Sequence, residues 1–195
     1  MMAVLNVWMF ILITLNSWKW ASGCTWMKTH NEAFLSNFQV LSKNSIVHLQ
    51  HACRGVVHDH GHLNMEFPNT LYNLITQLQA KDHILFILQT LKSVMRIYRR
   101  KYKKMDCNQH KLQIFLLDVD RQILELEQCA TYIVAGEVHK RVFMEMEIHF
   151  RSLMSHLKNT KYSAQSCNDV AEVTLRHLRR LDLLAAKTKT DSEFI

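Results

Sequence analysis

Five cysteines carry the most reactive chemistry in this chain of 195 residues. They are Cys24, Cys53, Cys107, Cys129 and Cys167. Thiols pair into disulfides in an oxidising compartment, and five of them leave one over after two bonds have formed. Their spacing does not give the connectivity, so the sequence alone leaves both the pairing and the odd thiol open.

The start of the chain favours that oxidising compartment. An apolar core over residues 7–15 is followed by small residues at 21–23, the pattern of a signal-peptide cleavage site. We predict that residues 1–23 are a signal peptide, that Cys24 begins the mature protein and that the protein is secreted. The alternative is an uncleaved anchor, but the core falls short of the roughly 20 apolar residues that a spanning helix needs. No later stretch is apolar enough to predict a membrane span.

Histidines offer a second possible chemistry. They alternate over His58–His62, and His48 and His51 stand just upstream. Imidazoles this dense can hold zinc or copper. The alternative is a solvated polar loop, which contains Gly61 and is not a preorganised site. We favour the solvated loop and predict neither a required metal nor a cofactor.

A basic run at Arg96–Lys104 has six basic residues in nine, in a chain of net charge +7. Tyr98 and Tyr102 lie within the run, but they continue an apolar seam and are predicted to be buried. The basic residues then form either a solvated helix end, where positive charge suits the helix dipole, or a surface for a polyanion or a receptor. We favour the first and retain a polyanion contact as a possibility. Secretion argues against a nucleic-acid partner.

Catalytic motifs are absent from the sequence. The chain contains no G-x-S-x-G, no phosphate-binding G-x-x-x-x-G-K-[ST], no H-E-x-x-H and no C-x-x-C. Glu-x-x-His, which di-iron helical bundles require on two helices, does not occur either. We predict that the protein is not an enzyme.

The elements that position these residues are predicted to be helices, because one proline and four glycines cannot supply the turns of an all-β domain. Apolar residues at steps of three and four predict five long helices and one short one. A mixed-polarity loop over 42–66 and a frayed tail over 187–195 complete the chain. The helices are expected at about 25–41, 67–79 (the short one), 82–103, 108–128, 137–157 and 168–186.

Amphipathic helices must bury their apolar faces against one another. We therefore predict an all-α fold of the long-chain helical cytokine kind, with a four-helix core, a fifth long helix and one short helix, all within residues 24–195. Such bundles serve many functions, so the fold alone does not decide what the protein does.

Five short motifs, in order along the chain, resemble the type I interferons of fish, in particular the four-cysteine group. Cys24-Thr25-Trp26 is similar to that family's mature start, and Phe67-Pro68-Asn69-Thr70-Leu71-Tyr72 to its Phe-Pro-x-x-Leu-Tyr. The segment 111–129 follows the family's Lys-Leu, Phe-Leu, Arg-Gln and Cys pattern, and 53–59 resembles its first long loop. The last helix opens with Ser166-Cys167-Asn168-Asp169-Val170, where the family has Cys-Ala-Trp-Glu-Val, so Asn168 and Asp169 depart from the pattern.

The resemblance implies the bridges Cys24–Cys129 and Cys53–Cys167, with Cys107 as the free thiol. It also implies a secreted antiviral cytokine that pairs two class II cytokine receptor chains, resembling the interferon alpha/beta receptor, and starts JAK-STAT signalling and interferon-stimulated gene expression. Receptor contacts carried over from the family, or inferred from position and charge, are Arg54, His58, Asp59, Arg176, Arg179 and Arg180.

Two other functions remain open from the sequence. A helical cytokine of another family, such as the interleukin-10 group, would share the bundle but pair its cysteines differently. A secreted antimicrobial helical bundle would act through the basic run, would need no receptor and would disrupt membranes directly.

Overall fold

Helices form the whole of the regular structure in the described residues, which are 24–27, 35–53, 66–131 and 133–192 of a computed structural model. The predicted signal peptide, residues 1–23, lies outside them. A 3-10 turn, η1, covers Thr25–Met27 and another, η2, covers Tyr102–Lys104. The α-helices are α2 (Asn37–Cys53), α3 (Asn69–Ile75), α4 (Ala80–Arg99), α5 (Gln109–Ala130), α6 (Glu137–Asn159) and α7 (Ala164–Ser192).

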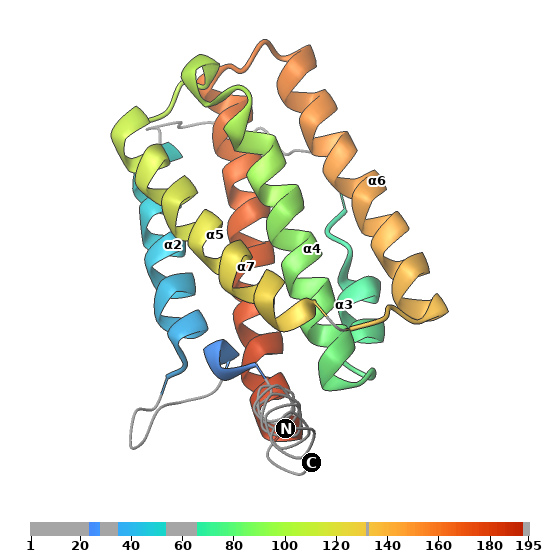
Figure 1. Cartoon of the computed structure of the whole chain (residues 1–195). Helices are drawn as coiled ribbons and strands as arrows, with labels where there is room; N and C mark the ends of the chain where they lie inside the picture. The colour runs from blue at the N-terminus through green and yellow to red at the C-terminus, as the bar shows by residue number, and fades with distance from the viewer. Residues whose placement is uncertain (1–23, 28–34, 54–65, 132, 193–195) are drawn as a thin grey trace, which may run out of the picture.

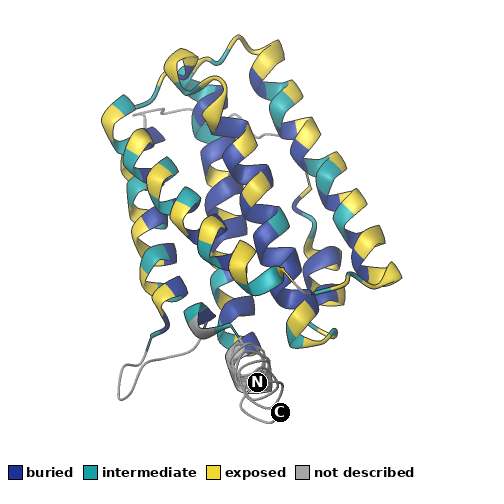
Figure 2. Cartoon of the chain, in the orientation of Figure 1, coloured by how far each residue is buried: buried dark blue, intermediate teal, exposed yellow. Residues whose placement is uncertain are grey.

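The all-α prediction of a four-helix core with a fifth long helix and one short helix is confirmed. Helices α2, α4, α5 and α7 pack on one another, α6 lies against α4 and α7, and the short α3 packs on α6 (Figure 1). The dark band of buried residues follows α4 through the middle of the molecule (Figure 2). The inward stripes that periodicity predicts for α4, α5 and α6 are buried, except that Tyr102 and Leu116 are only partly buried.

Helix α2 corrects the predicted start of the bundle. A helix was expected over 25–41 and a loop from Ser42, but the helix runs from Asn37 to Cys53. A capping box starts it, because the Ser36 hydroxyl accepts from the Gln39 backbone N–H at 3.2 Å while the side-chain Oε1 of Gln39 accepts from the Ser36 N–H at 3.2 Å. Its buried stripe includes two serines, which weakens the apolar pattern: Phe38, Ser42, Ser45, Leu49 and Ala52.

Helix α7 is longer than predicted at both ends, and the predicted frayed tail is helical as far as Ser192. Buried hydrogen bonds fix its position along the neighbouring helices. The Tyr98 hydroxyl of α4 donates to the Thr174 hydroxyl at 3.0 Å. The Tyr72 hydroxyl of α3 forms a hydrogen bond with the Nδ1 of His177 at 2.7 Å. Since a shift by one residue would leave these buried groups without partners, the bonds specify the register of α7.

Cysteine pairing agrees with the sequence-based expectation at one bridge and not at the other. The structure contains the implied Cys24–Cys129 bond, which joins η1 to the end of α5. The implied Cys53–Cys167 bond is wrong, because Cys53 is joined to Cys107 instead. Cys107 is therefore not the free thiol; among the described cysteines that is the buried Cys167.

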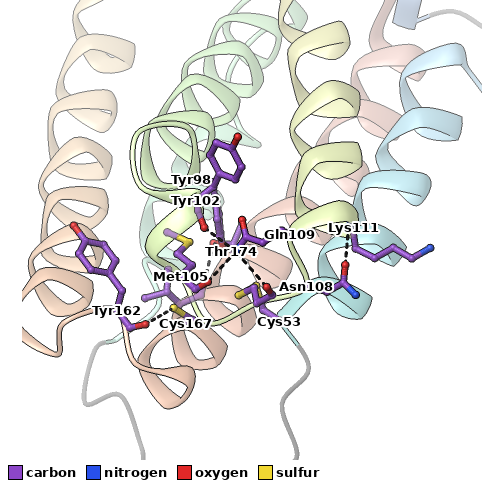
Figure 3. The surroundings of a disulfide bond; sticks show 12 residues. Cys53, Tyr98, Tyr102, Met105, Asn108, Gln109, Lys111, Tyr162, Cys167 and Thr174 are labelled. Carbon is purple, nitrogen blue, oxygen red and sulfur yellow. Dashed lines mark hydrogen bonds between the residues drawn. A yellow bond between two sulfur atoms is a disulfide. The ribbon is translucent and has the colours of Figure 1, made fainter.

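The connection between α4 and α5 explains this pairing. It passes directly over the end of α2, where the Asn108 N–H donates to the Ala52 carbonyl at 2.7 Å and so brings Cys107 to Cys53. Figure 3 shows Asn108 beside Cys53. Asn108 is also the N-cap of α5, since its side chain accepts from the Lys111 N–H at 3.0 Å. Cys167 lies in the same region, with its thiol directed to the Tyr162 carbonyl at 3.3 Å.

Peptide mapping of the oxidised protein should recover Cys24–Cys129 and Cys53–Cys107. Cys167 should resist iodoacetamide in the folded protein and react after unfolding, because it is buried and burial raises the pKa of its thiol. Mass spectrometry after alkylation with and without denaturant measures both. Recovery of a Cys53–Cys167 peptide as the main species would contradict the pairing seen here.

Candidate functional site

A shallow groove of about 310 Å³ runs between α2 and α7. Its floor is apolar, from Leu49, Ala171 and Leu175, and its rim is polar. Two of the arginines predicted to bind a receptor, Arg176 and Arg179, lie on this rim. The other lining residues are Gln50, Cys53, Asn168 and Glu172.

The three arginines predicted on α7 have different surroundings. Arg179 is exposed and forms no ion pair with any residue that the structure describes. Arg176 is also exposed, but its guanidinium lies 4.3 Å from the centre of the Phe67 ring. Arg180 is half-buried over Tyr72 at 5.2 Å and donates to the Asn73 side chain at 3.4 Å. Arg176 and Arg180 thus also pack against the segment that leads into α3.

The loop residues predicted to join them, Arg54, His58 and Asp59, lie outside the described residues. Both ends of that loop are nonetheless placed. Cys53, at the end of α2, lines the groove, and Phe67, just before α3, lies under Arg176. The first long loop therefore leaves and rejoins the bundle beside the arginine face of α7.

Behind this face is a cluster that the sequence did not predict, with Tyr72 and His177 buried and His149 half-buried. The Nε2 atoms of His149 and His177 lie 3.0 Å apart, and Tyr72 meets the Nδ1 of His177 at 2.7 Å. A hydrogen-bond chain satisfies all three if the Tyr72 hydroxyl donates to His177 and the Nε2–H of His177 donates to His149. Phe67 and Phe150 enclose His177, with ring centres at 4.6 and 4.8 Å.

Burial keeps both histidines neutral. It lowers the pKa of His149 from 6.5 to about 4, and it lowers the pKa of His177 well below its usual value. Arg176, on the surface above them, lowers both further. The cluster joins α3, α6 and α7 and supports the arginine face from below. Only the buried position of His177 on its helix stripe could have indicated it, since its partners lie far away in the sequence.

The opposite side of the molecule, formed by α4, α5 and α6, has a different character. Ion pairs cross it from Lys92 to Glu127 and from Arg96 to Glu147, both at 2.6 Å. Arg96 lowers the pKa of Glu147, so the basic residue that begins the predicted run already has a partner. Apolar side chains also stand exposed on α5 and α6: Leu117, Leu124, Met144 and Ile148.

Metal-binding geometry is not found in the described part of the chain. No three His, Cys, Asp or Glu side chains there converge on a point that could hold a metal ion. His48, one of the histidines near the predicted polar loop, lies on α2 and pairs with Asp118 of α5 at 2.7 Å. His58–His62 lies outside the described residues. No described helix is both long enough and apolar enough to cross a membrane.

Two separate surfaces on a helical bundle suit a protein that acts by binding. A family model decides which kind, because the interferon alpha/beta domain matches residues 27–188. The chain belongs to the interferon alpha/beta family. Members of this family are cytokines of the type I interferon kind, which confirms the resemblance drawn from the five short motifs.

Relatives of this interferon include Interferon a3 of the trout Oncorhynchus mykiss, which is 26% identical over 158 residues. That match covers 70% of this chain and 87% of the trout protein. The structure of zebrafish interferon 1 superposes with a TM-score of 0.69 at 23% identity. It covers 77% of this interferon and 96% of the zebrafish chain, so the two share the helical fold.

Proposed function

We propose that this interferon is a secreted antiviral cytokine that brings two class II cytokine receptor chains together and so starts JAK-STAT signalling and interferon-stimulated gene expression. The observation that carries the proposal is the interferon alpha/beta domain over residues 27–188. The ligand supplies no chemistry: it acts by holding two receptor chains at a fixed distance and orientation.

The first receptor chain is assigned to the α2–α7 groove. An apolar floor with a charged rim is the usual composition of a binding hot spot, where arginine is enriched. Arg179 is the leading contact, because it faces the groove and the described residues leave its guanidinium unpaired. Arg176 and the loop residues Arg54, His58 and Asp59 extend this surface, and Arg180 holds its edge through Tyr72.

The second receptor chain is assigned to the α4–α5–α6 side. The exposed apolar residues there, such as Leu117 and Leu124 on α5, can be buried by a partner. Because this side and the groove lie on different helices, both chains can bind the same bundle at once. An antimicrobial role without a receptor has no such use for the second surface.

The direct test is STAT tyrosine phosphorylation in fish cells treated with the purified, oxidised protein of residues 24–195. We expect a response within minutes that is lost when the disulfides are reduced. Absence of a response in several fish cell lines, from protein shown to be folded and bridged, would contradict the proposal. Membrane disruption that survives unfolding would favour the antimicrobial alternative.

Reversing the charge of Arg179 tests the groove. Arg179→Glu should lower signalling potency by about 10- to 100-fold, because it replaces a central cation with an anion that the receptor was not selected to meet. The melting temperature should stay unchanged, since Arg179 makes no ion pair with the described residues. Dose–response curves of STAT phosphorylation and thermal melts measure the two effects.

Arg100→Glu, at the exposed end of α4, is the matched control for the groove, because it makes the same charge change at a residue that does not line the groove. It should keep full potency on cells treated to remove surface polyanions. Equal losses for the two variants would show that net charge, rather than the groove, sets potency.

A further inference from the structure

Positive charge collects at one end of the bundle. The α4–α5 connection (residues 99–111) and the α6–α7 turn (residues 158–169) together carry eight basic and two acidic residues, while the whole chain has a net charge of +7. Nearly all of the excess charge is therefore in these two segments, which we call the basic end. Its cations are Arg99, Arg100, Lys101, Lys103, Lys104, Lys111, Lys158 and Lys161.

The two segments are neighbours in space. Both connections lie at the same end of the molecule (Figure 1). At their junction, the Cys167 thiol contacts the Tyr162 carbonyl of its own segment. It also interacts with the backbone and with the carboxylate charge of Asp106 in the other segment. Figure 3 places Tyr162 and Cys167 beside Met105. The sequence showed only the first segment, because residues 112–157 separate it from the second.

The cations of the basic end are available to a ligand. No salt bridge joins any of them to a described residue, whereas Arg96, just before them, is held by Glu147. Of the two acidic side chains, Asp169 already accepts from Gln165 at 2.7 Å and lies 3.6 Å from His156. Only Asp106 remains as an exposed opposing charge within the two segments.

The basic end lacks what a nucleic acid or a membrane would need. Tyr98 is fully buried and bonded to Thr174, and Tyr102 is half-buried with Lys103 over its ring, so neither presents a free face to a base. None of the exposed large apolar side chains that the structure describes belongs to these segments. Surface-bound membrane helices, in contrast, pair basic residues with exposed apolar ones.

The backbone at Lys161 adds a second observation. Lys161 and Tyr162 both have left-handed backbone angles, with φ of 54° and 60°. The turn ends α6 with the Tyr162 N–H donating to the Leu157 carbonyl at 2.9 Å, a geometry in which glycine is the usual residue. A lysine therefore occupies a position where glycine would be less strained, and its side chain adds to the basic end.

We propose that the basic end binds sulfated polysaccharide of the heparan sulfate class. The inference rests on the proposed secretion, which brings the protein to surfaces that carry such chains. Recognition would be by charge alone, through many weak contacts with sulfate groups and the release of their counterions. Because none of the eight cations of the basic end lines the α2–α7 groove, the polysaccharide can hold the cytokine near cells while leaving it able to signal.

A pair of charge-matched triple variants tests the proposal. The basic-end variant is Lys101→Gln, Lys103→Gln and Lys104→Gln; the control is Lys81→Gln, Lys140→Gln and Arg141→Gln, exposed at the opposite helix ends. Binding to immobilised heparan sulfate at physiological salt should fall by about 10- to 100-fold in the first and stay within about twofold in the second. The basic-end variant should signal like wild type in cells that lack heparan sulfate.

Each other outcome has a defined meaning. Equal losses in both variants, or equal wild-type binding to desulfated heparin, would overturn the proposal. Binding to phosphatidylglycerol vesicles as strong as binding to heparan sulfate would assign the surface to membranes instead. If the protein bound heparan sulfate selectively but did not trigger STAT phosphorylation in treated cells, only the proposed receptor function would be overturned. The two proposals can therefore fail separately.

Lys161→Gly gives an independent readout. It removes one charge and also places glycine in a left-handed position, so it should raise the melting temperature while it weakens heparan sulfate binding. The two effects move in opposite directions, which a merely structural lysine would not produce. A more stable protein with unchanged heparan sulfate binding would show that Lys161 is not part of the binding surface.

Discussion

Replacing both Cys24 and Cys129 by serine should lower the free energy of unfolding by about 4–5 kcal/mol. A disulfide that closes a loop of roughly a hundred residues raises the free energy of the unfolded chain by about that amount, because it reduces the conformational entropy of that chain. The bond spans a sequence separation of 105. It also ties η1 to the bundle, where Met27 is buried and the Arg121 guanidinium lies 5.8 Å from the centre of the Trp26 ring. Without the disulfide, only the contacts of Trp26 and Met27 themselves hold the short N-terminal segment on the bundle.

Urea unfolding followed by circular dichroism measures this loss. Cys167→Ser is the control, because it changes a buried cysteine that forms no bond and keeps a group able to donate to the Tyr162 carbonyl. We expect the control to cost about 1–2 kcal/mol, mainly from burying a more polar atom. A double serine variant no less stable than this control would show that the 24–129 bond does not support the fold.

Acidification from pH 7 towards 4 should destabilise the protein, beginning at a higher pH than that at which most of its carboxylates titrate. The folded-state pKa of His149 is about 4, against 6.5 in an unfolded chain, so between these values the unfolded state binds a proton that the folded state does not. Stability must then fall with pH through this window. For His149 alone the loss is about 2 kcal/mol, once its partial exposure is allowed for, and His177 adds to it.

The geometry explains the direction. In the hydrogen-bond chain assigned above, the Nε2–H of His177 donates to the bare Nε2 of His149, 3.0 Å away. A proton on His149 would set two N–H groups against each other, beneath the positive charge of Arg176. Glu147 acts in a lower window, because Arg96 lowers the pKa of its carboxyl and its stabilisation is lost only as the pH falls through that lowered value.

Stability curves at half-unit steps of pH measure this effect. His149→Gln should flatten the decline between pH 6.5 and 4, whereas His110→Gln, at an exposed histidine of α5, should leave it unchanged. A wild-type curve that stays level until pH 4 would mean that the His149–His177 pair is already charged in the folded protein.

Periodicity located the helices whose buried positions are filled by apolar residues, as in α4, α5 and α6. It misplaced α2, because Ser42 and Ser45 are buried there through polar contacts. Ser45 donates to the Leu41 carbonyl and accepts from the amide of the buried Gln122 on α5. A polar seam between two helices carries no hydrophobic period, yet the Ser36–Gln39 capping box marked the true start.

The candidate site was predictable only in part. The sequence indicated the arginines of α7 by charge and position, but it could not show that Arg176 and Arg180 pack on Phe67 and Tyr72. It also could not choose among three cysteines that the fold gathers at one end, since proximity there depends on how the α4–α5 connection crosses α2. Contacts between distant segments decide both points.

The anchored ends of the first long loop affect how such a protein can diversify. Twelve residues, 54–65, separate Cys53, held by its disulfide, from the segment at Phe67 that Arg176 covers. Lengthening a loop whose ends are fixed costs little, about 0.6 kcal/mol for a doubling. Insertions and deletions between these anchors can therefore alter what the surface recognises while the helices stay intact, so partner choice can evolve faster than the bundle that presents it.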